Sequence, residues 1–275
     1  MEWVPAPTPI NENRRAKAVE KTGIIGTDQI FLFDIYLEIA KDISGYEAGS
    51  FSLYDSKNQC MISEIGKPGE RELHKKHDKN ASVCSYVLLD KKPLLVFDLT
   101  KHEIFKFHPG VIAGLVKSYC GFPVINKDGY ALGTFCMLNF SEVKEMSSEK
   151  VHLIEKLVSR LALQIDTQTE QKELTSQKIS KSIDIFMESR DESTLIDYKN
   201  FIDICSGLSL PSEKAINLIE ADLCEVKNNE VVLSLKGNEL QEKMNIVTKI
   251  HNQVKVEGNE ANSLIDNALD KLGEL

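Results

Sequence analysis

The strongest pattern of apolar and polar positions in the chain is that of a β-hairpin. Two runs rich in β-forming residues, Tyr119–Ile125 and Ala131–Leu138, flank the tetrapeptide Asn-Lys-Asp-Gly at residues 126–129. An Asp-Gly pair favours such a reversal because it tolerates the positive φ angles of a tight turn. Gly121 and Gly133 interrupt the two runs, either as bulges or because another backbone or a ligand approaches there. The pattern predicts the central hairpin of an antiparallel sheet.

Upstream of this hairpin, a helical pattern gives way to two short strands. Apolar residues recur at helical spacing over residues 12–44, with one break at residues 24–26, and Asp28 is the expected cap of the second helix. Strands are predicted at Gly49–Asp55 and Cys60–Ile65, each bounded by turn-forming residues. The order of elements is therefore helices first and strands afterwards.

A long helix is predicted after the hairpin. Apolar residues that follow Ser147 share one helical face, and this stripe is lost over residues 166–178 before it resumes at Ile179. The sequence leaves open whether residues 166–178 are the solvated middle of one connecting helix or a hinge. The residues of the stripe are Val151, Ile154, Leu157, Val158, Leu161 and Ile165.

The last third of the chain has the pattern of a second, smaller unit. A helix is predicted at Leu195–Cys205 and another from Pro211 to about Leu223, because proline suits a first helical turn. A hairpin over residues 226–233 follows, and a helix begins near Lys236. This order resembles a winged helix-turn-helix. Residues 256–275 have the pattern of a short terminal amphipathic helix.

Several short motifs together resemble the GAF domain family, in particular the sensory GAF domains of bacterial histidine kinases and diguanylate cyclases. The central hairpin has that family's aromatic-x-Gly-x-Pro strand, Asp-Gly turn and Gly-Thr-x-Cys strand. Ala81–Tyr86 resembles its Ser-x-Cys helix, Leu94–Leu99 its Leu-Val-Val-x-Asp strand, and Phe105–Val111 its segment with a central proline. The series covers about residues 10–166 in the order and spacing of the family.

The resemblance implies an α+β fold: a GAF/PAS-like antiparallel sheet flanked by helices, a long connecting helix and a small winged-helix-like α+β C-terminal domain. The expected boundaries are an irregular N-terminal arm at residues 1–12, a GAF-like sensor domain at 13–166, a connecting helix at 167–190 and the C-terminal domain at 191–275.

Composition narrows the class of protein. The chain has 275 residues, 42% of them apolar, and a net charge of −9 without any block rich in lysine or arginine. Because phosphate neutralisation dominates nucleic-acid affinity, this balance disfavours DNA or RNA as a partner. The six cysteines show no CxxC spacing, so neither a zinc module nor a disulfide framework is indicated. The lack of a long apolar run or a secretory pattern predicts a cytoplasmic protein away from membranes.

GAF domains typically hold a ligand between the sheet and the helices and loops on its far side. The alternative is an ordinary core filled by the domain's own side chains. If the family's site carries over, the ligand-binding residues of this chain are Phe51, Leu53, Cys84, Phe97, Leu99, Phe107, Val111, Tyr119, Gly121, Thr134 and Cys136.

Specialised functions of the family are mostly disfavoured by the residues present. The chain has no Cys-His pair for a covalent bilin and lacks the ordered signature of the cyclic-nucleotide-binding relatives. A thiol-based methionine sulfoxide reductase is an alternative that would use Cys84 with Cys120 or Cys136. His108 is expected to bind a ligand or to hold its loop, and Asp98 to brace a loop. No catalytic residue, metal site or cofactor is predicted, His74 and His77 forming only a solvated basic patch.

The sequence also constrains the output of the chain. No histidine between His152 and His251 is available as a phosphoacceptor, and residues 191–275 contain 16 acidic residues against 8 basic ones. That charge opposes DNA contact by a recognition helix. The favoured hypothesis is a non-catalytic sensor that binds a small ligand or a signalling protein, forms a homodimer and signals through protein contacts of its C-terminal domain. The alternatives are a ligand-responsive transcription regulator and the thiol reductase.

Overall fold

The computed structural model describes residues 2–27, 31–66, 75–189 and 192–245. The expected cap Asp28, the residue His74 and the helix predicted at 256–275 lie outside these residues. The chain divides into two units, Met1–Glu173 and Leu174–Leu275, which are described in turn.

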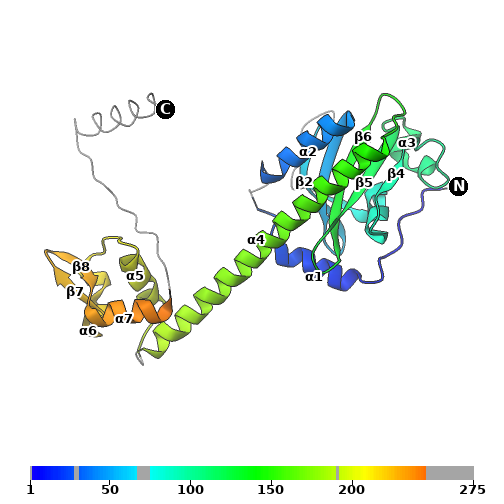
Figure 1. The fold of residues 1–275 in the computed structure, drawn as a ribbon. Helices are drawn as coiled ribbons and strands as arrows, with labels where there is room; N and C mark the ends of the chain where they lie inside the picture. The colour runs from blue at the N-terminus through cyan, green and yellow to red at the C-terminus, as the bar shows by residue number, and fades with distance from the viewer. Residues whose placement is uncertain (1, 28–30, 67–74, 190–191, 246–275) are drawn as a thin grey trace, which may run out of the picture. The chain divides into compact units, whose positions relative to one another are not determined.

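The first unit is built on a six-stranded sheet in which every neighbouring pair is antiparallel. The strand order is β3-β2-β1-β6-β5-β4, so the predicted hairpin β5–β6 lies at the centre beside β1 (Figure 1). The predicted antiparallel α+β fold is confirmed. The strands are β1 (Ala48–Tyr54), β2 (Asn58–Ile65), β3 (Lys76–Asp78), β4 (Leu94–Val96), β5 (Ser118–Ile125) and β6 (Ala131–Asn139).

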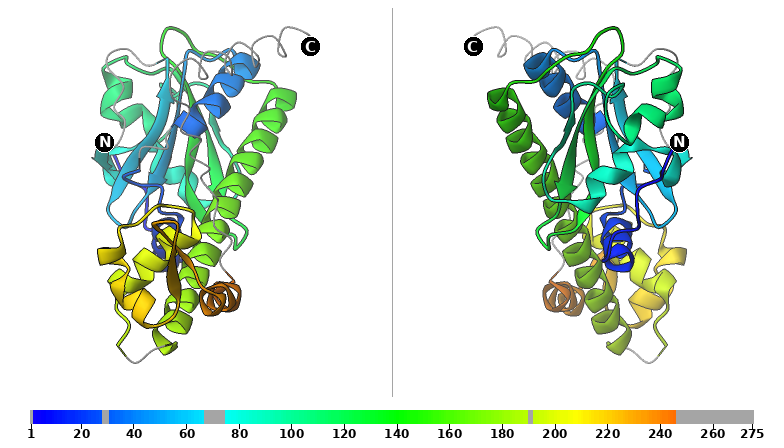
Figure 2. Two further views of the ribbon diagram at one scale, coloured as in Figure 1. Left: turned by 90° about the vertical axis from the view of Figure 1, so that its left-hand side faces the viewer. Right: turned by 90° about the vertical axis from the view of Figure 1, so that its right-hand side faces the viewer.

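Three helices cover one face of this sheet: α1 (Glu12–Thr22), α2 (Phe31–Ser44) and α4 (Ser148–Glu188). Figures 1 and 2 show α2 and α4 lying along the same side of the strands. Apolar side chains from the three helices and from β1, β2, β5 and β6 form one continuous core on that face. In it the ring of Phe33 meets that of Phe51 edge-on, at 5.3 Å between centroids.

The opposite face of the sheet is covered by short helical turns instead of long helices. These are the 3-10 turns η1 (Lys79–Ala81), η2 (Val83–Leu89) and η3 (Phe105–Phe107), and the four-residue helix α3 (Pro109–Ile112). The segment predicted to be a helix at Ala81–Tyr86 is therefore a 3-10 turn, capped by the Ser82 hydroxyl, which accepts a hydrogen bond from the Cys84 N–H. Apolar side chains from these turns and the sheet form a second core.

Helix α4 runs without interruption through residues 166–178, so this segment is helical and not a hinge. The stripe predicted from the sequence packs on the sheet, with Ile154, Leu161 and Ile165 fully buried. Where the stripe is lost, polar contacts with α1 replace it: the Lys172 ammonium donates to the carbonyl of Thr22 at 3.0 Å. The segment contains no glycine or proline, and its Glu, Gln, Lys and Leu residues favour a helix.

The described residues of the second unit include a two-stranded sheet and three short helices around a core that contains Phe186 and Phe201. The helix predicted from Pro211 to Leu223 is shorter than expected. It is a 3-10 turn followed by a five-residue helix, because Asp222 adopts a left-handed conformation with φ of 60° and stops it. The elements are α5 (Leu195–Cys205), η4 (Ser212–Lys214), α6 (Ile216–Glu220), β7 (Cys224–Lys227), β8 (Glu230–Leu233) and α7 (Leu235–Met244).

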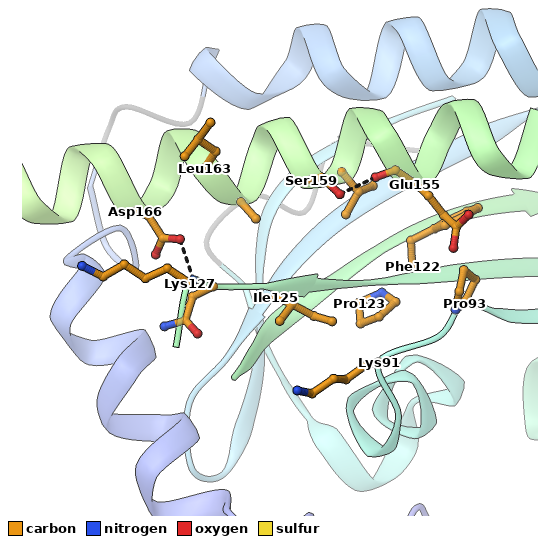
Figure 3. Close-up of a pocket in the computed structure, with 13 residues that line it drawn as sticks. Lys91, Pro93, Phe122, Pro123, Ile125, Lys127, Glu155, Ser159, Leu163 and Asp166 are labelled. Carbon is orange, nitrogen blue, oxygen red and sulfur yellow. Dashed lines mark hydrogen bonds between the residues drawn. The ribbon is translucent and has the colours of Figure 1, made fainter. Parts of the chain in front are cut away.

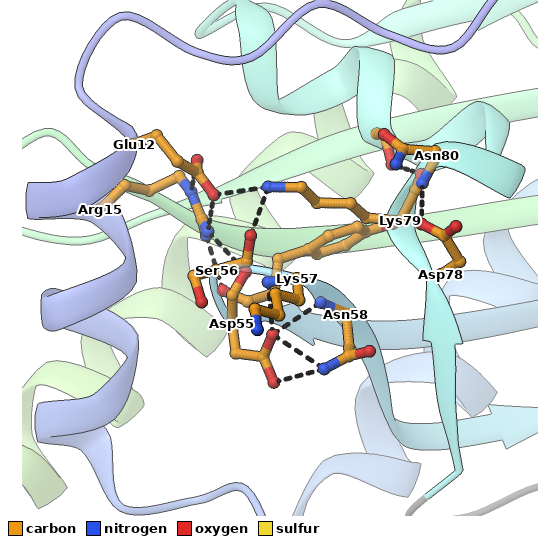
Figure 4. A network of polar contacts seen from close by, with 11 residues as sticks. Glu12, Arg15, Asp55, Ser56, Lys57, Asn58, Asp78, Lys79 and Asn80 are labelled. Atoms are coloured by element: carbon orange, nitrogen blue, oxygen red, sulfur yellow. Dashed lines mark hydrogen bonds and ion pairs between the residues drawn. The ribbon is translucent and has the colours of Figure 1, made fainter.

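A buried arginine joins α1 to the sheet. The Arg15 guanidinium donates to the carbonyls of Tyr54 and Asp55, at 2.8 and 3.1 Å, and pairs with the Glu12 carboxylate at 2.7 Å. Glu12 also accepts a hydrogen bond from Lys79, which precedes η2 (Figure 4). This network therefore connects the first helix, the β1–β2 turn and the turns on the other side of the sheet.

The N-terminal arm continues this connection. The Trp3 indole N–H donates to the carbonyl of Asn80 at 2.9 Å, and the Tyr86 hydroxyl donates to the carbonyl of Val4 at 2.8 Å. The arm thus lies along η1 and η2. None of the helices in the described parts of the chain is both long and apolar enough to cross a membrane.

The Arg15 network can be tested by truncation. Arg15→Met leaves two buried carbonyls and the Glu12 carboxylate without this donor, and breaking a buried ion pair costs about 3–5 kcal/mol. The control Arg14→Met makes the same chemical change on an exposed neighbour and is expected to cost less than about 0.5 kcal/mol. Urea denaturation of both variants measures the difference, and equal losses would contradict the assigned role.

The same network predicts a dependence of stability on pH. Burial alone would raise the pKa of Glu12, but hydrogen bonds and charges from Arg15 and Lys79 outweigh it and hold this pKa below its ordinary value of 4.5. Its contribution to stability is therefore complete above pH 4.5 and is lost as the pH falls through the lower, folded pKa.

We expect the free energy of unfolding to fall more steeply below about pH 4.5 in the wild-type protein than in Glu12→Gln. Denaturation in urea between about pH 6 and about pH 3 checks this, since the other carboxyl groups are shared by both proteins. Parallel curves would show that Glu12 does not carry the effect.

Candidate functional site

The largest cavity described in the first unit lies between the sheet and the turns η1 and η2, on the face opposite α4. It has a volume of about 680 Å³, within the range typical of small-molecule sites. Its lining is Ser50, Gln59, Met61, His77, Asp78, Ala81, Ser82, Val83, Cys84, Leu99, His108, Leu115, Val116, Tyr119, Cys136, Leu138 and Phe140.

Four of the residues predicted to bind a ligand line this cavity: Cys84, Leu99, Tyr119 and Cys136. Three more share its side of the sheet without lining it. Val111 belongs to the core beside it, and Gly121 and Thr134 lie on the strands two residues from Tyr119 and Cys136.

The structure does not bring Phe51 and Leu53 to this cavity. Both are fully buried in the core beneath α1, α2 and α4. Side chains alternate along a strand, so the residues of β1 that face the cavity side are Ser50 and its even-numbered neighbours. Phe97 also packs against the α4-side core, and Phe107 is half-buried on η3, where its ring lies under the Lys106 ammonium.

This alternation is also the signal that could have found the missed residue Ser50. When a polar residue stands next to a large apolar one in a strand, the two side chains point to opposite faces of the sheet. Ser50 and Phe51 form such a pair. The rim residues Leu115 and Val116 and the wall residues Gln59, Met61 and His77 carried no such local signal.

Gly121 allows the Tyr119 side chain to lie along the strand. A methyl group at Gly121 would come within 2.4 Å of the Tyr119 hydroxyl and 2.6 Å of Val87 on η2. At Gly133 a methyl group would instead meet the backbone carbonyl of Ser52 at 2.0 Å. Gly121 therefore makes room for a side chain, and Gly133 makes room for the backbone of the neighbouring strand.

Hydroxyl groups beside the cavity are buried without satisfying their hydrogen-bonding capacity. Those of Tyr54, Tyr119 and Thr134 have no hydrogen-bond partner in the part of the chain that the structure describes. Burial, followed by the nearby Cys84 and Cys136 thiols, raises the pKa of both tyrosines far above the ordinary value. The two phenols are thus neutral and able to donate a hydrogen bond. Of Tyr54, Tyr119 and Thr134, only Tyr119 lines the cavity.

The cysteines considered for thiol chemistry are divided by the sheet. Cys84 and Cys136 are in contact beside the cavity, with 3.7 Å between their sulfur atoms. Cys120 lies in the core on the other face, where its sulfur is 3.4 Å from the Tyr46 hydroxyl. Burial raises the pKa of Cys120 to about 11. A pairing of Cys84 with Cys120 would have to cross the sheet.

His108 and Asp98 both hold loops. The His108 Nδ1 accepts a hydrogen bond from the Gly110 N–H, so the ring proton is on Nε2, which donates to the carbonyl of Ala81 at 3.0 Å. Both ring nitrogens are therefore used within the protein. Hydrogen bonds from Thr100, together with the ion pair to Lys101, lower the pKa of Asp98 and brace the turn after β4.

A second, smaller cavity of about 290 Å³ lies between α4 and the end of β5 (Figure 3). Its rim is charged, and the Lys127 N–H donates to the Asp166 carboxylate at 2.8 Å. Burial raises the pKa of Asp166. These contacts attach the β5–β6 turn to α4. Because the Lys127 N–H and the Asp166 carboxylate already bind each other, this cavity is the weaker candidate for a ligand.

Metal binding has no support in the described residues, where no three His, Cys, Asp or Glu side chains are grouped so that they could hold an ion.

Residues 30–165 match the model of the GAF domain family. No similar sequence was found among curated proteins. Similar solved structures include the blue-light-absorbing form of the PixJ GAF domain of Thermosynechococcus elongatus, at 11% identity and a TM-score of 0.46, covering 62% of this chain and 96% of that one.

Two further similar structures are residues 122 to 287 of a methyl-accepting chemotaxis protein and the GAF-B domain of DevS from Mycobacterium smegmatis. The first is 16% identical with a TM-score of 0.45, over 58% of this chain and 98% of that one. The second is 12% identical with a TM-score of 0.43, over 52% and 97%. The family match agrees with the observed sheet and helices and with the motif series in the sequence. The chain contains a GAF domain at residues 30–165.

Proposed function

We propose that this protein is a non-catalytic signalling sensor whose GAF domain binds a small molecule in the 680 Å³ cavity. The observation that carries the proposal is Tyr119, which lines that cavity and whose buried hydroxyl has no hydrogen-bond partner among the described residues. An unpartnered buried hydroxyl costs about 1–3 kcal/mol, and a bound ligand would supply the missing hydrogen bond.

The lining indicates the kind of ligand. Apolar and sulfur-containing side chains such as Met61, Val83 and Leu138 make up much of the wall, and Tyr119 offers a neutral donor. A largely apolar molecule with at least one hydrogen-bond acceptor fits this combination. We assign no catalytic step to this site. We further propose that the protein acts in the cytoplasm.

We further propose that the chain forms a homodimer through α4. Leu163 and Leu174 are 54% and 56% exposed, and eleven residues correspond to about three helical turns, so they lie on the same side of this helix. Exposed leucines repeated on one side of a helix are typical of a helix–helix interface. A second copy of the chain, packed along α4, would bury them.

The proposed output is a protein contact made by the second unit, which we regard as winged-helix-like from its order of helices, hairpin and helix. Apolar side chains exposed on it include Ile196 and Leu235, at 71% and 80%. A transcription regulator remains the alternative suggested by that order. The acidic charge of the unit and the five-residue length of α6 favour protein over DNA.

The thiol reductase alternative draws support from the contact between Cys84 and Cys136. Both thiols are largely buried, however, at 9% and 1% exposure, which leaves little of either sulfur open to a substrate as large as methionine sulfoxide. We therefore favour the sensor.

Two matched tyrosine variants test the ligand site. Tyr119→Phe removes an unpartnered hydroxyl, so the unliganded protein is expected to be as stable as the wild type or more so. Tyr46→Phe removes a hydroxyl that donates to the Lys144 carbonyl at 2.7 Å on the other face, and is expected to cost about 1 kcal/mol.

For any compound that raises Tm in a thermal-shift screen of small metabolites, Tyr119→Phe should weaken binding by about 3–10-fold while Tyr46→Phe leaves Kd unchanged. Titration calorimetry measures both. Equal affinities for wild type and Tyr119→Phe would remove Tyr119 from the site, and a screen without any hit would count against a ligand.

Lysine substitutions at the exposed leucines of α4 test the proposed dimer. The wild-type protein is expected to sediment at twice the mass of one chain at micromolar concentration, and the double variant Leu163→Lys/Leu174→Lys as a monomer, because buried like charges repel. Ile35→Lys/Val143→Lys, two comparably exposed positions off α4, serves as the control and should remain a dimer. A wild-type monomer in analytical ultracentrifugation would refute the proposal.

A further inference from the structure

Two cysteines that are far apart in the chain meet in the wall of the larger cavity. Cys84 is on η2 and Cys136 on β6, 52 residues later, and their sulfur atoms are 3.7 Å apart. No disulfide joins them in the structure, so this is a contact between two thiols. We propose that Cys84 and Cys136 are an oxidisable dithiol that closes to a disulfide on exposure to a small hydroperoxide.

Position distinguishes this pair from the other cysteines. Cys84 and Cys136 both line the cavity, so a small oxidant that enters it reaches them. Cys120 is buried in the core on the other side of the sheet, and Cys205 and Cys224 belong to the core of the second unit.

The two thiols have different surroundings, and this suggests the order of attack. Cys84 is the more exposed, at 9% against 1% for Cys136. The Cys136 sulfur is held 3.0 Å from the Ser50 hydroxyl, next to the sulfur of Cys84. We therefore assign Cys84 as the thiol that meets the oxidant and Cys136 as the one that resolves it.

The chemistry balances as a two-electron oxidation. The Cys84 sulfur, having lost its proton, attacks the outer peroxide oxygen, the O–O bond breaks, and Cys84 becomes a sulfenic acid while the other oxygen leaves as water or an alcohol. The Cys136 sulfur, also losing its proton, then attacks the Cys84 sulfur, the S–O bond breaks and water leaves. In total, two thiols are oxidised to one disulfide and one hydroperoxide is reduced.

Closing the disulfide changes the cavity wall. An S–S bond of about 2.05 Å requires the two sulfur atoms to approach by about 1.7 Å from their present separation. η2 is a 3-10 turn that also carries the wall residue Val83, so the bond would tie this wall to β6. Oxidation of this pair needs no ligand in the cavity.

Peptide mapping of the full chain tests the pair directly. Trypsin places each cysteine on a peptide of its own, with Cys84 in residues 80–91 and Cys136 in residues 128–144. After reduction, exposure to hydrogen peroxide and alkylation of the remaining thiols, we expect these two peptides to be linked and dithiothreitol to separate them. Oxidised wild-type protein without this linked pair would overturn the proposal.

Three variants sharpen the result. In Cys84→Ser, Cys136 should stay alkylatable, whereas in Cys136→Ser the unresolved Cys84 should proceed to sulfinic acid, detectable by mass. Cys120→Ser is the matched control, since its cysteine is buried on the other face, and should give the same linked pair as the wild type. Loss of the link in Cys120→Ser, or unchanged oxidation of Cys136 in Cys84→Ser, would contradict the assignment.

Discussion

The structure of the first unit depends on the alternation of side chains across its central antiparallel strands. In β1, Phe51 and Leu53 enter a closely packed core under three helices, while Ser50, which precedes Phe51, faces the cavity on the other side. The same rule sends Cys120 to the helix side and Tyr119 to the cavity side. One face of the sheet therefore supplies stability, and the other is free to hold a hollow with polar and sulfur groups.

The cavity exists because its face is covered by short turns that do not fill it. The turns are held at their edges by α1, the N-terminal arm and the Glu12–Arg15–Lys79 network, so a wall made of 3-10 turns keeps a defined position. Inside, the Tyr119 ring lies over Gly121, and Cys84 meets Cys136. The proposed ligand binding and thiol oxidation thus both involve one wall of the cavity, η2.

Helix α4 serves two environments along its length. Its first part is packed on the sheet through the apolar stripe, and its later part makes polar contacts with α1. The exposed Leu163 lies in the first part and the exposed Leu174 in the later part. The helix then ends in the core of the second unit, where Phe186 is fully buried. A single uninterrupted helix is therefore shared by the two units.

The sequence by itself determined the local elements: the Asp-Gly hairpin, the stripe of α4, the β7–β8 hairpin and the GAF motif series depend on neighbouring residues. It also identified four residues of the cavity, Cys84, Leu99, Tyr119 and Cys136. Only the tertiary structure decided which side of the sheet Phe51 and Leu53 occupy, that Ser50 faces the cavity, and that Cys84 meets Cys136 and not Cys120. The physical reason is that strand register and the packing of distant segments set these contacts, and neither is encoded in the spacing along one stretch of chain.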